Sequence, residues 1–361
     1  MLSGALRAVI DTAALKHNLS RVHELAPGCR VLAVIKANAY GHGLVAVAEA
    51  LAAADAFAVA RLEEAVTLRE AGCRARIVLL EGVQDARELA EAARLDLDLF
   101  VHQDWQIALF EAWGGPHNFR VWLKIDSGMH RLGFAPAGVP ATAARLDACR
   151  HVARPVHLAT HLAEAERADG PETGAQIEQF AKATAALPGE RSIANSAGLI
   201  AWPAARADWV RPGIMLYGIS PFPGKTGADL GLRPAMTFET RVIALKDVAA
   251  GDRVGYGGTW TAAGAARIAV AAVGYGDGYP RSARNGTPVE VNGRAAIVAG
   301  RPSMDMLTID VTGLPRVAIG DRVELWGDAV PVEHVAAAAG TIAYELTCRV
   351  GRRVIFSTRR P

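Results

Sequence analysis

VLAVIKANAYGHG, residues 31–43, is the stretch of this chain that says most about its fold. It opens with the apolar run Val31–Ile35, continues with Lys36 and ends in a loop that holds Gly41 and Gly43. A continuous apolar run predicts a strand that is covered on both faces. An amine placed just after such a strand is partly desolvated, which lowers its pKa and suits it to Schiff-base formation. The stretch therefore predicts a buried strand followed by a lysine whose surroundings suit Schiff-base chemistry.

Seven similar runs follow along the chain. They are AFAVA (56–60), RIVLL (76–80), LDLFV (97–101), VWLKI (121–125), VHLAT (156–160), RSIAN (191–195) and WVRPG (209–213). The segments between them carry apolar residues at helical spacing, and so does Thr12–Ala26 before the first run. Strands and helices that alternate in this way predict an α/β fold, a (β/α)8 TIM-type barrel over residues 11–230. An open, doubly wound sheet fits the same pattern, because periodicity does not reveal closure.

The pattern changes after residue 230. Short β-rich stretches bounded by Gly, Pro and Asp indicate strands and turns. They include TRVIALKDV (240–248), RIAVAAVGYG (267–276), TPVEVNGRAAIVAG (287–300), MLTIDVTGL (306–314) and DRVELWG (321–327). We expect a separate, mainly-β C-terminal domain over residues 231–361, which a strand from residues 1–10 could join. The Pro- and Gly-rich stretch 220–234 indicates a linker between the two domains.

Composition excludes several classes of protein. The 39 Lys and Arg residues nearly balance 37 Asp and Glu residues, so no global field attracts nucleic acid or an anionic membrane. There is no signal-peptide pattern and no apolar run of membrane-spanning length, which predicts a soluble cytoplasmic protein. The four cysteines form no CxxC pair, so we expect buried, reduced thiols and no metal site.

Polar residues gather where the predicted barrel strands end. Lys36, Lys124, His161, Ser196 and Arg211 follow or close five different strands. In a barrel of this type the chemistry sits at the carboxyl ends of the strands, where the connecting loops meet. We therefore expect these side chains to converge on one rim.

The stretch around Lys36 resembles the pyridoxal-phosphate lysine motif of bacterial alanine racemases. The resemblance continues in order through KIDSGMHRLG (124–133), THLAEAE (160–166), ANSAGLI (194–200), VRPGIMLYG (210–218), VGYGGTW (254–260), VGYGDGYPR (273–281), GRPSMDM (300–306) and YELTC (344–348). It implies an isomerase, a homodimer with composite sites, that interconverts L- and D-alanine for peptidoglycan synthesis or alanine catabolism.

The resemblance also implies two catalytic bases. Lys36 would carry pyridoxal 5'-phosphate as an internal aldimine and act on D-alanine, and Tyr256 of the partner subunit would act on L-alanine. Two bases are needed because the planar carbanion must lose its proton on one face and regain it on the other.

Further roles follow from the same resemblance. Arg211 would bond the pyridine nitrogen, with His161 packed behind it. Arg131 and the amide of Met304 from the partner would bind the substrate, and Lys124, carbamylated in many family members, would brace Arg131. The remaining residues are implied to hold the phosphate (Tyr40, Ser196, Tyr344 and the amides of Gly213 and Ile214) and to form or support the gate of the entry channel (Tyr275, Tyr344, Arg301 and Asp305).

Three other functions fit part of the sequence. A barrel-type amino-acid decarboxylase shares the two-domain plan, but Arg211 stands where an acid is expected. A racemase of broader specificity is a closer alternative than the decarboxylase. His130, Gly276 and Ser303 depart from residues common in alanine racemases, which leaves the range of substrates open. A non-catalytic pyridoxal-phosphate protein would lack the C-terminal domain and with it Tyr256.

Overall fold

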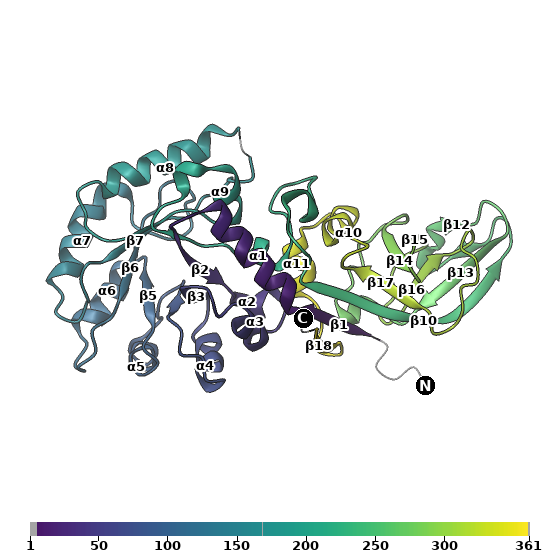
Figure 1. Ribbon diagram of the computed structural model, residues 1–361, viewed down its shortest axis with the longest axis horizontal. Helices are drawn as coiled ribbons and strands as arrows, with labels where there is room; N and C mark the ends of the chain where they lie inside the picture. The colour runs from purple at the N-terminus through teal and green to yellow at the C-terminus, as the bar shows by residue number, and fades with distance from the viewer. Residues whose placement is uncertain (1–5, 168, 360–361) are drawn as a thin grey trace.

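The computed structural model describes residues 6–167 and 169–359. Two lobes lie along the long axis of the molecule, one built on a parallel barrel and one on a largely antiparallel sheet (Figure 1). The barrel strands pair in chain order, and the last pairs with the first, Val210 opposite Val31. The predicted (β/α)8 barrel with a separate mainly-β domain is therefore confirmed, and closure excludes the open sheet.

The barrel strands lie where the apolar runs predicted them. They are β2 (Arg30–Val34), β3 (Ala56–Val59), β4 (Ile77–Leu79), β5 (Asp98–Val101), β6 (Val121–Lys124), β7 (His157–Ala159), β8 (Arg191–Ser192) and β9 (Trp209–Val210). Their residues are almost all buried, because helices cover the outer face and side chains fill the interior.

Helices surround the barrel. They are α1 (Thr12–Leu25), α3 (Leu44–Ala50), α4 (Leu62–Glu70), α5 (Ala86–Arg94), α6 (Asp104–Glu111), α7 (Val139–Ala148), α8 (Pro171–Thr184) and α9 (Ser196–Ala201), with 3-10 turns at Pro136–Gly138, Pro203–Ala205 and Ile214–Tyr217. The segment labelled α2 (Lys36–Tyr40) is a short turn after β2 with non-helical backbone angles. Helix α1 begins after Asp11, whose carboxylate accepts hydrogen bonds from the amides of Ala13 (2.8 Å) and Ala14 (3.1 Å). This is an N-cap, and it sets the start of the helix predicted before the first barrel strand.

The second lobe is built on an eight-stranded sheet in the order β13-β16-β15-β14-β17-β10-β1-β18. Its elements are β1 (Arg7–Asp11), β10 (Met236–Val248), β13 (Ala266–Ala271), β14 (Pro288–Val291), β15 (Arg294–Val298), β16 (Leu307–Asp310), β17 (Arg322–Trp326) and β18 (Ile355–Arg359), together with the hairpin β11 (Arg253–Val254) and β12 (Trp260–Thr261), helices α10 (Val332–Ala339) and α11 (Ala343–Cys348), and 3-10 turns at Ala228–Leu230, Tyr256–Gly258 and Tyr275–Asp277.

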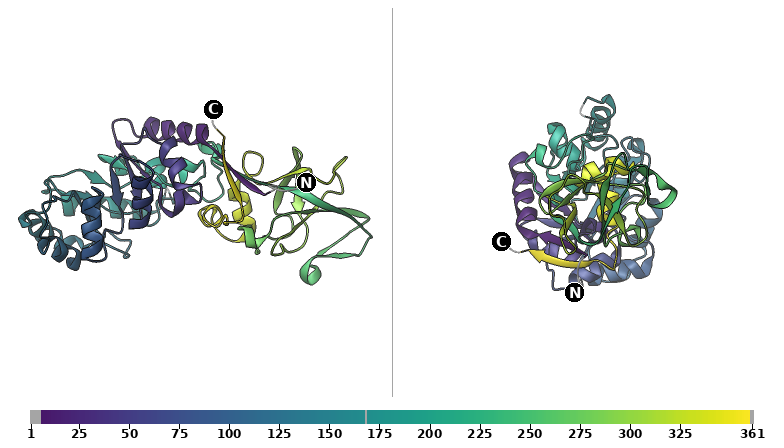
Figure 2. Two further views of the ribbon diagram at one scale, coloured as in Figure 1. Left: turned by 90° about the horizontal axis from the view of Figure 1, so that it is seen from below. Right: turned by 90° about the vertical axis from the view of Figure 1, so that its right-hand side faces the viewer.

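The first and the last strand that the structure describes both belong to this sheet. Strand β1 pairs antiparallel with β10 and parallel with β18, so the two terminal strands lie side by side (Figure 2). The strand expected within residues 1–10 is thus found over Arg7–Asp11, and residues 1–5 of that expectation lie outside the described residues. The domain boundary at residue 230 stays a prediction.

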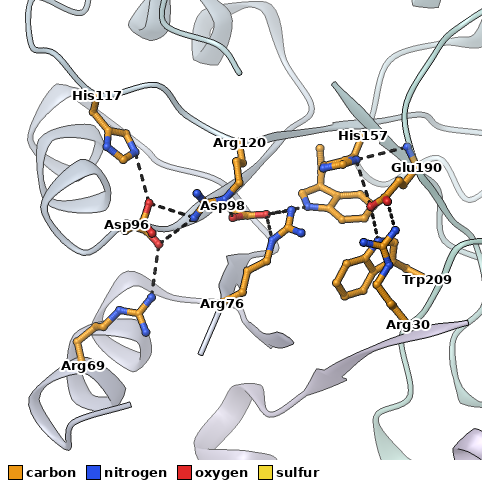
Figure 3. A network of polar contacts seen from close by, with 11 residues as sticks. Arg30, Arg69, Arg76, Asp96, Asp98, His117, Arg120, His157, Glu190 and Trp209 are labelled. Atoms are coloured by element: carbon orange, nitrogen blue, oxygen red, sulfur yellow. Dashed lines mark hydrogen bonds and ion pairs between the residues drawn. The ribbon is translucent and has the colours of Figure 1, made fainter. Parts of the chain in front are cut away.

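The floor of the barrel, where its strands begin, holds an ionic network (Figure 3). Asp98 is fully buried, and its two carboxylate oxygens accept from Nε of Arg76 and Nε of Arg120, both at 2.6 Å. The indole of Trp122 donates to the same carboxylate at 3.3 Å. A buried charge is tolerated only when it is paired and hydrogen-bonded, and these partners supply that pairing for Asp98 at the end of the barrel where its strands begin.

Among the helices described, none has both the length and the apolar character needed to cross a lipid bilayer.

Candidate active site

A cavity of about 520 Å³ opens at the carboxyl ends of the barrel strands. Residues from α11 of the second lobe complete its wall. The cavity brings together ten of the residues that the sequence pointed to: Lys36, Tyr40, Lys124, Arg131, His161, Ser196, Arg211, Gly213, Ile214 and Tyr344. The convergence expected from the strand ends is therefore present in the fold.

Lys36 opens a turn of unusual backbone conformation. Ala37, Asn38, Ala39 and Tyr40 all have positive φ, between 53° and 54°. Such left-handed residues cost roughly 1–2 kcal/mol each when they carry a Cβ. The turn is braced by the Asn38 side chain, which accepts from the amide of Leu44 at 2.9 Å. Strain of this kind gathers at sites where geometry matters for function.

The turn also packs tightly against α11. A Cβ added to Gly41, whose φ is 82°, would lie 2.0 Å from the carbonyl oxygen of Thr347. Only glycine allows this close approach of two backbones. Gly41 therefore seats the lysine turn on the helix that carries Tyr344.

The electrostatic setting of Lys36 favours its neutral amine. Burial, and next the positive charge of Arg131, lower the pKa of Lys36. A neutral amine is the nucleophilic form that attacks a carbonyl carbon. The lowered pKa thus raises the fraction of Lys36 in the nucleophilic form.

Arg211 is buried at the floor of the cavity, and neutral groups hold its guanidinium. It donates to the Ser192 hydroxyl at 2.6 Å, to the carbonyl of Thr160 and, at 3.2 Å, to the carbonyl of Ile193. Burial lowers its pKa to about 10, so it keeps its charge near neutral pH. A guanidinium only donates hydrogen bonds, so Arg211 can bond an unprotonated ring nitrogen and disfavours a protonated one.

His161 lies beside this arginine. Its Nδ1 is 3.5 Å from Nη2 of Arg211. Burial, followed by the charge of Arg211, lowers the pKa of His161 well below its ordinary value. A neutral ring next to Arg211 orients the guanidinium without repelling it.

Hydroxyl and amide groups line another side of the cavity. Ser196 Oγ accepts from the amides of Gly213 (2.9 Å) and Met215 (3.4 Å), which leaves its own O–H to donate. The Ile214 amide has no hydrogen-bond partner within residues 6–167 and 169–359. A side chain on Gly213 would place its Cβ 2.4 Å from the Tyr40 hydroxyl. The hydroxyls of Ser196 and Tyr40 and the amide of Ile214 are thus neutral donors around a small space. This arrangement suits an anion.

The phenols at this end of the cavity are protonated near neutral pH. Burial raises the pKa of Tyr40, and it raises the pKa of Tyr344 to about 12. Their ring centroids are 5.9 Å apart, and Tyr40 also stacks on Tyr217 at 4.8 Å. Both hydroxyls are therefore available as donors to an anion.

Two further cations face the cavity. Arg131 has no hydrogen bond or ion pair with any part of the chain that the structure describes, so its guanidinium is free to bind a carboxylate. Burial, then the charges of Arg211 and Arg131, lower the pKa of Lys124 to about 8. His130 takes a φ of 55°, and its amide donates to the carboxylate of Asp126 at 2.9 Å.

Five expected site residues lie elsewhere, on the second lobe. Tyr256 is 67% exposed and Met304 is 53% exposed, and neither lines this chain's large cavity. The amide of Tyr275 donates to the carbonyl of Ser303 at 3.0 Å, which joins the two loops that carry Tyr275, Arg301, Met304 and Asp305. One chain therefore does not bring these five residues to Lys36.

Asp305 forms an ion pair with Arg353 at 2.8 Å, and Arg353 also reaches Asp277 at 3.0 Å. A Cβ on Gly276 would lie 2.4 Å from the Arg353 guanidinium, so glycine leaves room for this arginine.

Sequence reasoning missed several residues of the cavity wall. Glu81 directly follows the predicted strand RIVLL, and Thr160 closes VHLAT, so the strand-end rule could have found both. The expectation of four buried cysteines is wrong for Cys348, which is exposed and lines the cavity, because α11 lies at its edge. Cys29 and Cys73 are half-buried, and only Cys149 is buried; all four thiols are free.

Comparisons with known proteins agree with this architecture. The family models "Alanine racemase, N-terminal domain" and "Alanine racemase, C-terminal domain" match residues 10–221 and 235–357. The alanine racemase of Thioalkalivibrio sulfidiphilus is 54% identical over 97% of this chain and 98% of its own length, and that of Shewanella sediminis is 50% identical over 96% and 97%. The crystal structure of the biosynthetic alanine racemase from Pseudomonas aeruginosa superposes with a TM-score of 0.95 at 48% identity, covering 98% of this chain and 99% of that one. This chain belongs to the alanine racemase family of isomerases.

Proposed function

We propose that this enzyme interconverts L- and D-alanine with two bases, Lys36 and Tyr256, on opposite faces of the substrate. The observation that carries the proposal is the position of Lys36 just after a barrel strand, in the cavity that also holds Arg131 and Arg211, where burial lowers its pKa. Lys36 takes or returns the α-proton of D-alanine, and Tyr256 does so for L-alanine. A single fixed side chain cannot serve both faces of a planar carbanion.

The residues of the cavity fit pyridoxal 5'-phosphate. The hydroxyls of Tyr40, Ser196 and Tyr344 and the amide of Ile214 form a donor set suited to a phosphate. A basic cluster is not required there, since amides and hydroxyls bind an anion without one. When bound, the cofactor supplies an electron sink for the carbanion. Arg211 would weaken the electron withdrawal by the cofactor. Its guanidinium only donates hydrogen bonds and therefore opposes protonation of the pyridine nitrogen.

Tyr256 reaches the reaction from a second copy of the chain. Its exposure, together with its position on the lobe that does not hold Lys36, supports a homodimer in which each sheet lobe completes the partner's cavity. Met304 would then offer its amide to the substrate carboxylate, beside Arg131. Tyr275, Tyr344, Arg301 and Asp305 would narrow the channel to a small side chain.

The cellular role we propose is supply of D-alanine for peptidoglycan or, in the opposite direction, catabolism of D-alanine, in the cytoplasm. The family assignment and the barrel cavity support alanine as substrate. A broader-specificity racemase is the second candidate, since Gly276 and Ser303 alter the wall near the gate.

Chiral chromatography tests the activity. Purified holoprotein incubated with L-alanine should yield D-alanine until the two enantiomers are equal. A panel of other L-amino acids, serine first, separates the two candidates. A protein that binds the cofactor and yields no D-alanine would overturn the proposal.

Replacement of Tyr256 by Phe tests the second base. The variant should keep the absorbance of the bound cofactor, because Tyr256 lies outside the set of cofactor donors, and should lose at least about 10²-fold of its racemisation rate. Tyr279→Phe is the control, because it removes a phenol hydroxyl from the same lobe. Tyr279 is 1% exposed and packs in the sheet lobe, so the racemisation rate of this variant should stay near that of wild type. Full activity of the Tyr256 variant would show that another group is the base.

A further inference from the structure

A second, smaller cavity lies behind the lysine turn, where the barrel meets the sheet lobe. Its volume is about 50 Å³. Its walls include His42, the segment 217–219, the segment 326–328 at the end of β17, and Thr347 of α11. None of these residues belongs to the large cavity, so this is a separate space.

One residue of this cavity wall holds a buried polar atom that has no protein partner within the described residues. His42 is 1% exposed, and its Nε2 has no hydrogen-bond partner within the described part of the chain. Its Nδ1 lies 3.0 Å from the carbonyl oxygen of Tyr40 and 3.2 Å from that of Ala39. Since Nδ1 is bonded within its own turn, Nε2 is the ring nitrogen of His42 that remains for a group in the cavity.

The protonation state of the His42 ring determines which ligand the cavity can bind. Two carbonyl oxygens accept at Nδ1, so Nδ1 carries the proton. Burial lowers the pKa of His42 to about 4, which leaves Nε2 with a free lone pair near neutral pH. A buried acceptor that lost water on folding costs free energy unless a donor replaces that water. The ligand must therefore be a small hydrogen-bond donor.

We propose that this cavity binds internal water that donates a hydrogen bond to His42 Nε2, and that the bound water holds the turn carrying Tyr40 in place. The volume of about 50 Å³ exceeds the roughly 10–15 Å³ that one water requires. Thr347 and Glu333 also line the space and provide further polar partners, of which a buried water needs two to four.

A stack of rings connects this site to the active site. The His42 ring lies 4.5 Å from the ring of Tyr217, which in turn stacks on Tyr40 at 4.8 Å. The Tyr217 hydroxyl is anchored to the carbonyl of Val34 at 3.0 Å. Fixing His42 therefore limits the motion of Tyr40. This consequence rests on the proposed function, in which Tyr40 holds the cofactor phosphate.

A crystal structure of the holoprotein, at a resolution that orders internal water, tests the binding. We expect a water oxygen about 2.7–3.2 Å from His42 Nε2. Absence of a peak there, or a protein group bonded to Nε2, would overturn the proposal. This result does not depend on racemase activity, so it separates failure of the water site from failure of the proposed function.

Two substitutions test the effect on Tyr40. His42→Asn keeps a donor near the position of Nδ1 and removes the acceptor at Nε2, whereas His42→Gln keeps an acceptor near Nε2. We expect the dissociation constant for pyridoxal phosphate, read from absorbance, to rise about tenfold in His42→Asn and to stay within about threefold in His42→Gln. Equal values in the two variants would contradict the positioning role, and the wild-type crystal decides the water site if His42→Asn does not fold.

Discussion

At the scale of single residues, the turn after Lys36 is the feature least accessible from sequence. Intrinsic preferences assign alanine to right-handed helix, so nothing in KANAY predicts four residues with φ near 53°. The conformation is imposed by packing: Gly41 approaches the Thr347 carbonyl, and Asn38 caps the following helix. The position of Lys36 at the cavity was predictable, because it follows an apolar strand in the sequence, whereas its proposed role came from the resemblance.

Ala37→Gly should stabilise the protein. Ala37 has a φ of 54°, and glycine removes the left-handed penalty of about 1–2 kcal/mol at an entropic cost of roughly 0.5–1 kcal/mol. We expect the free energy of unfolding to rise by roughly 0.5–1 kcal/mol, measured by urea denaturation. Ala181→Gly, at an exposed position inside α8, should lower it by about 1 kcal/mol. Two changes of the same sign would show that the turn is unstrained.

Lys124 should form a carbamate with a pH dependence set by its pKa. The neutral amine attacks carbon dioxide, which gives a carbamate and releases one proton. With a pKa of about 8, about a tenth of Lys124 is neutral at pH 7 and about nine tenths at pH 9. In ¹³C-bicarbonate, a carbamate carbon signal should therefore grow between these pH values, as seen by NMR of the holoprotein.

Two variants give this experiment its controls. Lys124→Arg should abolish the signal, and Lys16→Arg, at an exposed lysine of α1, should leave it unchanged. A wild-type protein with no such signal at pH 9 would contradict the assignment.

At the scale of elements, the barrel strands followed from local pattern alone. Strands buried on both faces read as apolar runs, and all eight runs became barrel strands. The sheet of the second lobe was harder to foresee, because its neighbours are distant in the chain. Strand β1 lies between β10 and β18, with Ala8 opposite both Phe238 and Phe356, and no local pattern specifies such partners.

Asp98→Asn should destabilise the barrel without changing its chemistry. The substitution leaves the guanidinium of Arg76 without a charged partner and leaves Arg120 with Asp96 alone, at 3.0 Å. Because these arginines are 23% and 36% exposed, we expect a loss of about 2–3 kcal/mol, below the roughly 3–5 kcal/mol of a fully buried pair. Denaturation midpoints measure the loss, and kcat of the folded variant should stay near wild type.

Asp104→Asn is the control for this network. Asp104 is 73% exposed and pairs with Arg145 at 3.0 Å on the surface. Exposed ion pairs contribute at most about 1 kcal/mol. If both substitutions changed stability equally, the network at the barrel floor would not be a stabilising element.

At the scale of the whole molecule, the two lobes divide the proposed catalytic groups between them. Lys36 lies in the barrel cavity, while Tyr256 and Met304 lie exposed on the sheet lobe. The sequence could identify both groups through motifs. It could not reveal that the fold separates them within one chain, since that separation depends on how the lobes are joined. A composite site in a twofold dimer accounts for both observations.

Subunit complementation tests this account most directly. Lys36→Ala and Tyr256→Phe homodimers should each be inactive. In an equal mixture after subunit exchange, half of the dimers pair one chain of each kind, and one of their two sites has both an intact Lys36 and an intact Tyr256. D-alanine formation should then recover to about a quarter of the wild-type rate per total protein. If the mixture stays as inactive as its components although exchange is verified, Lys36 and Tyr256 do not act together across the dimer, and the composite two-base site is wrong.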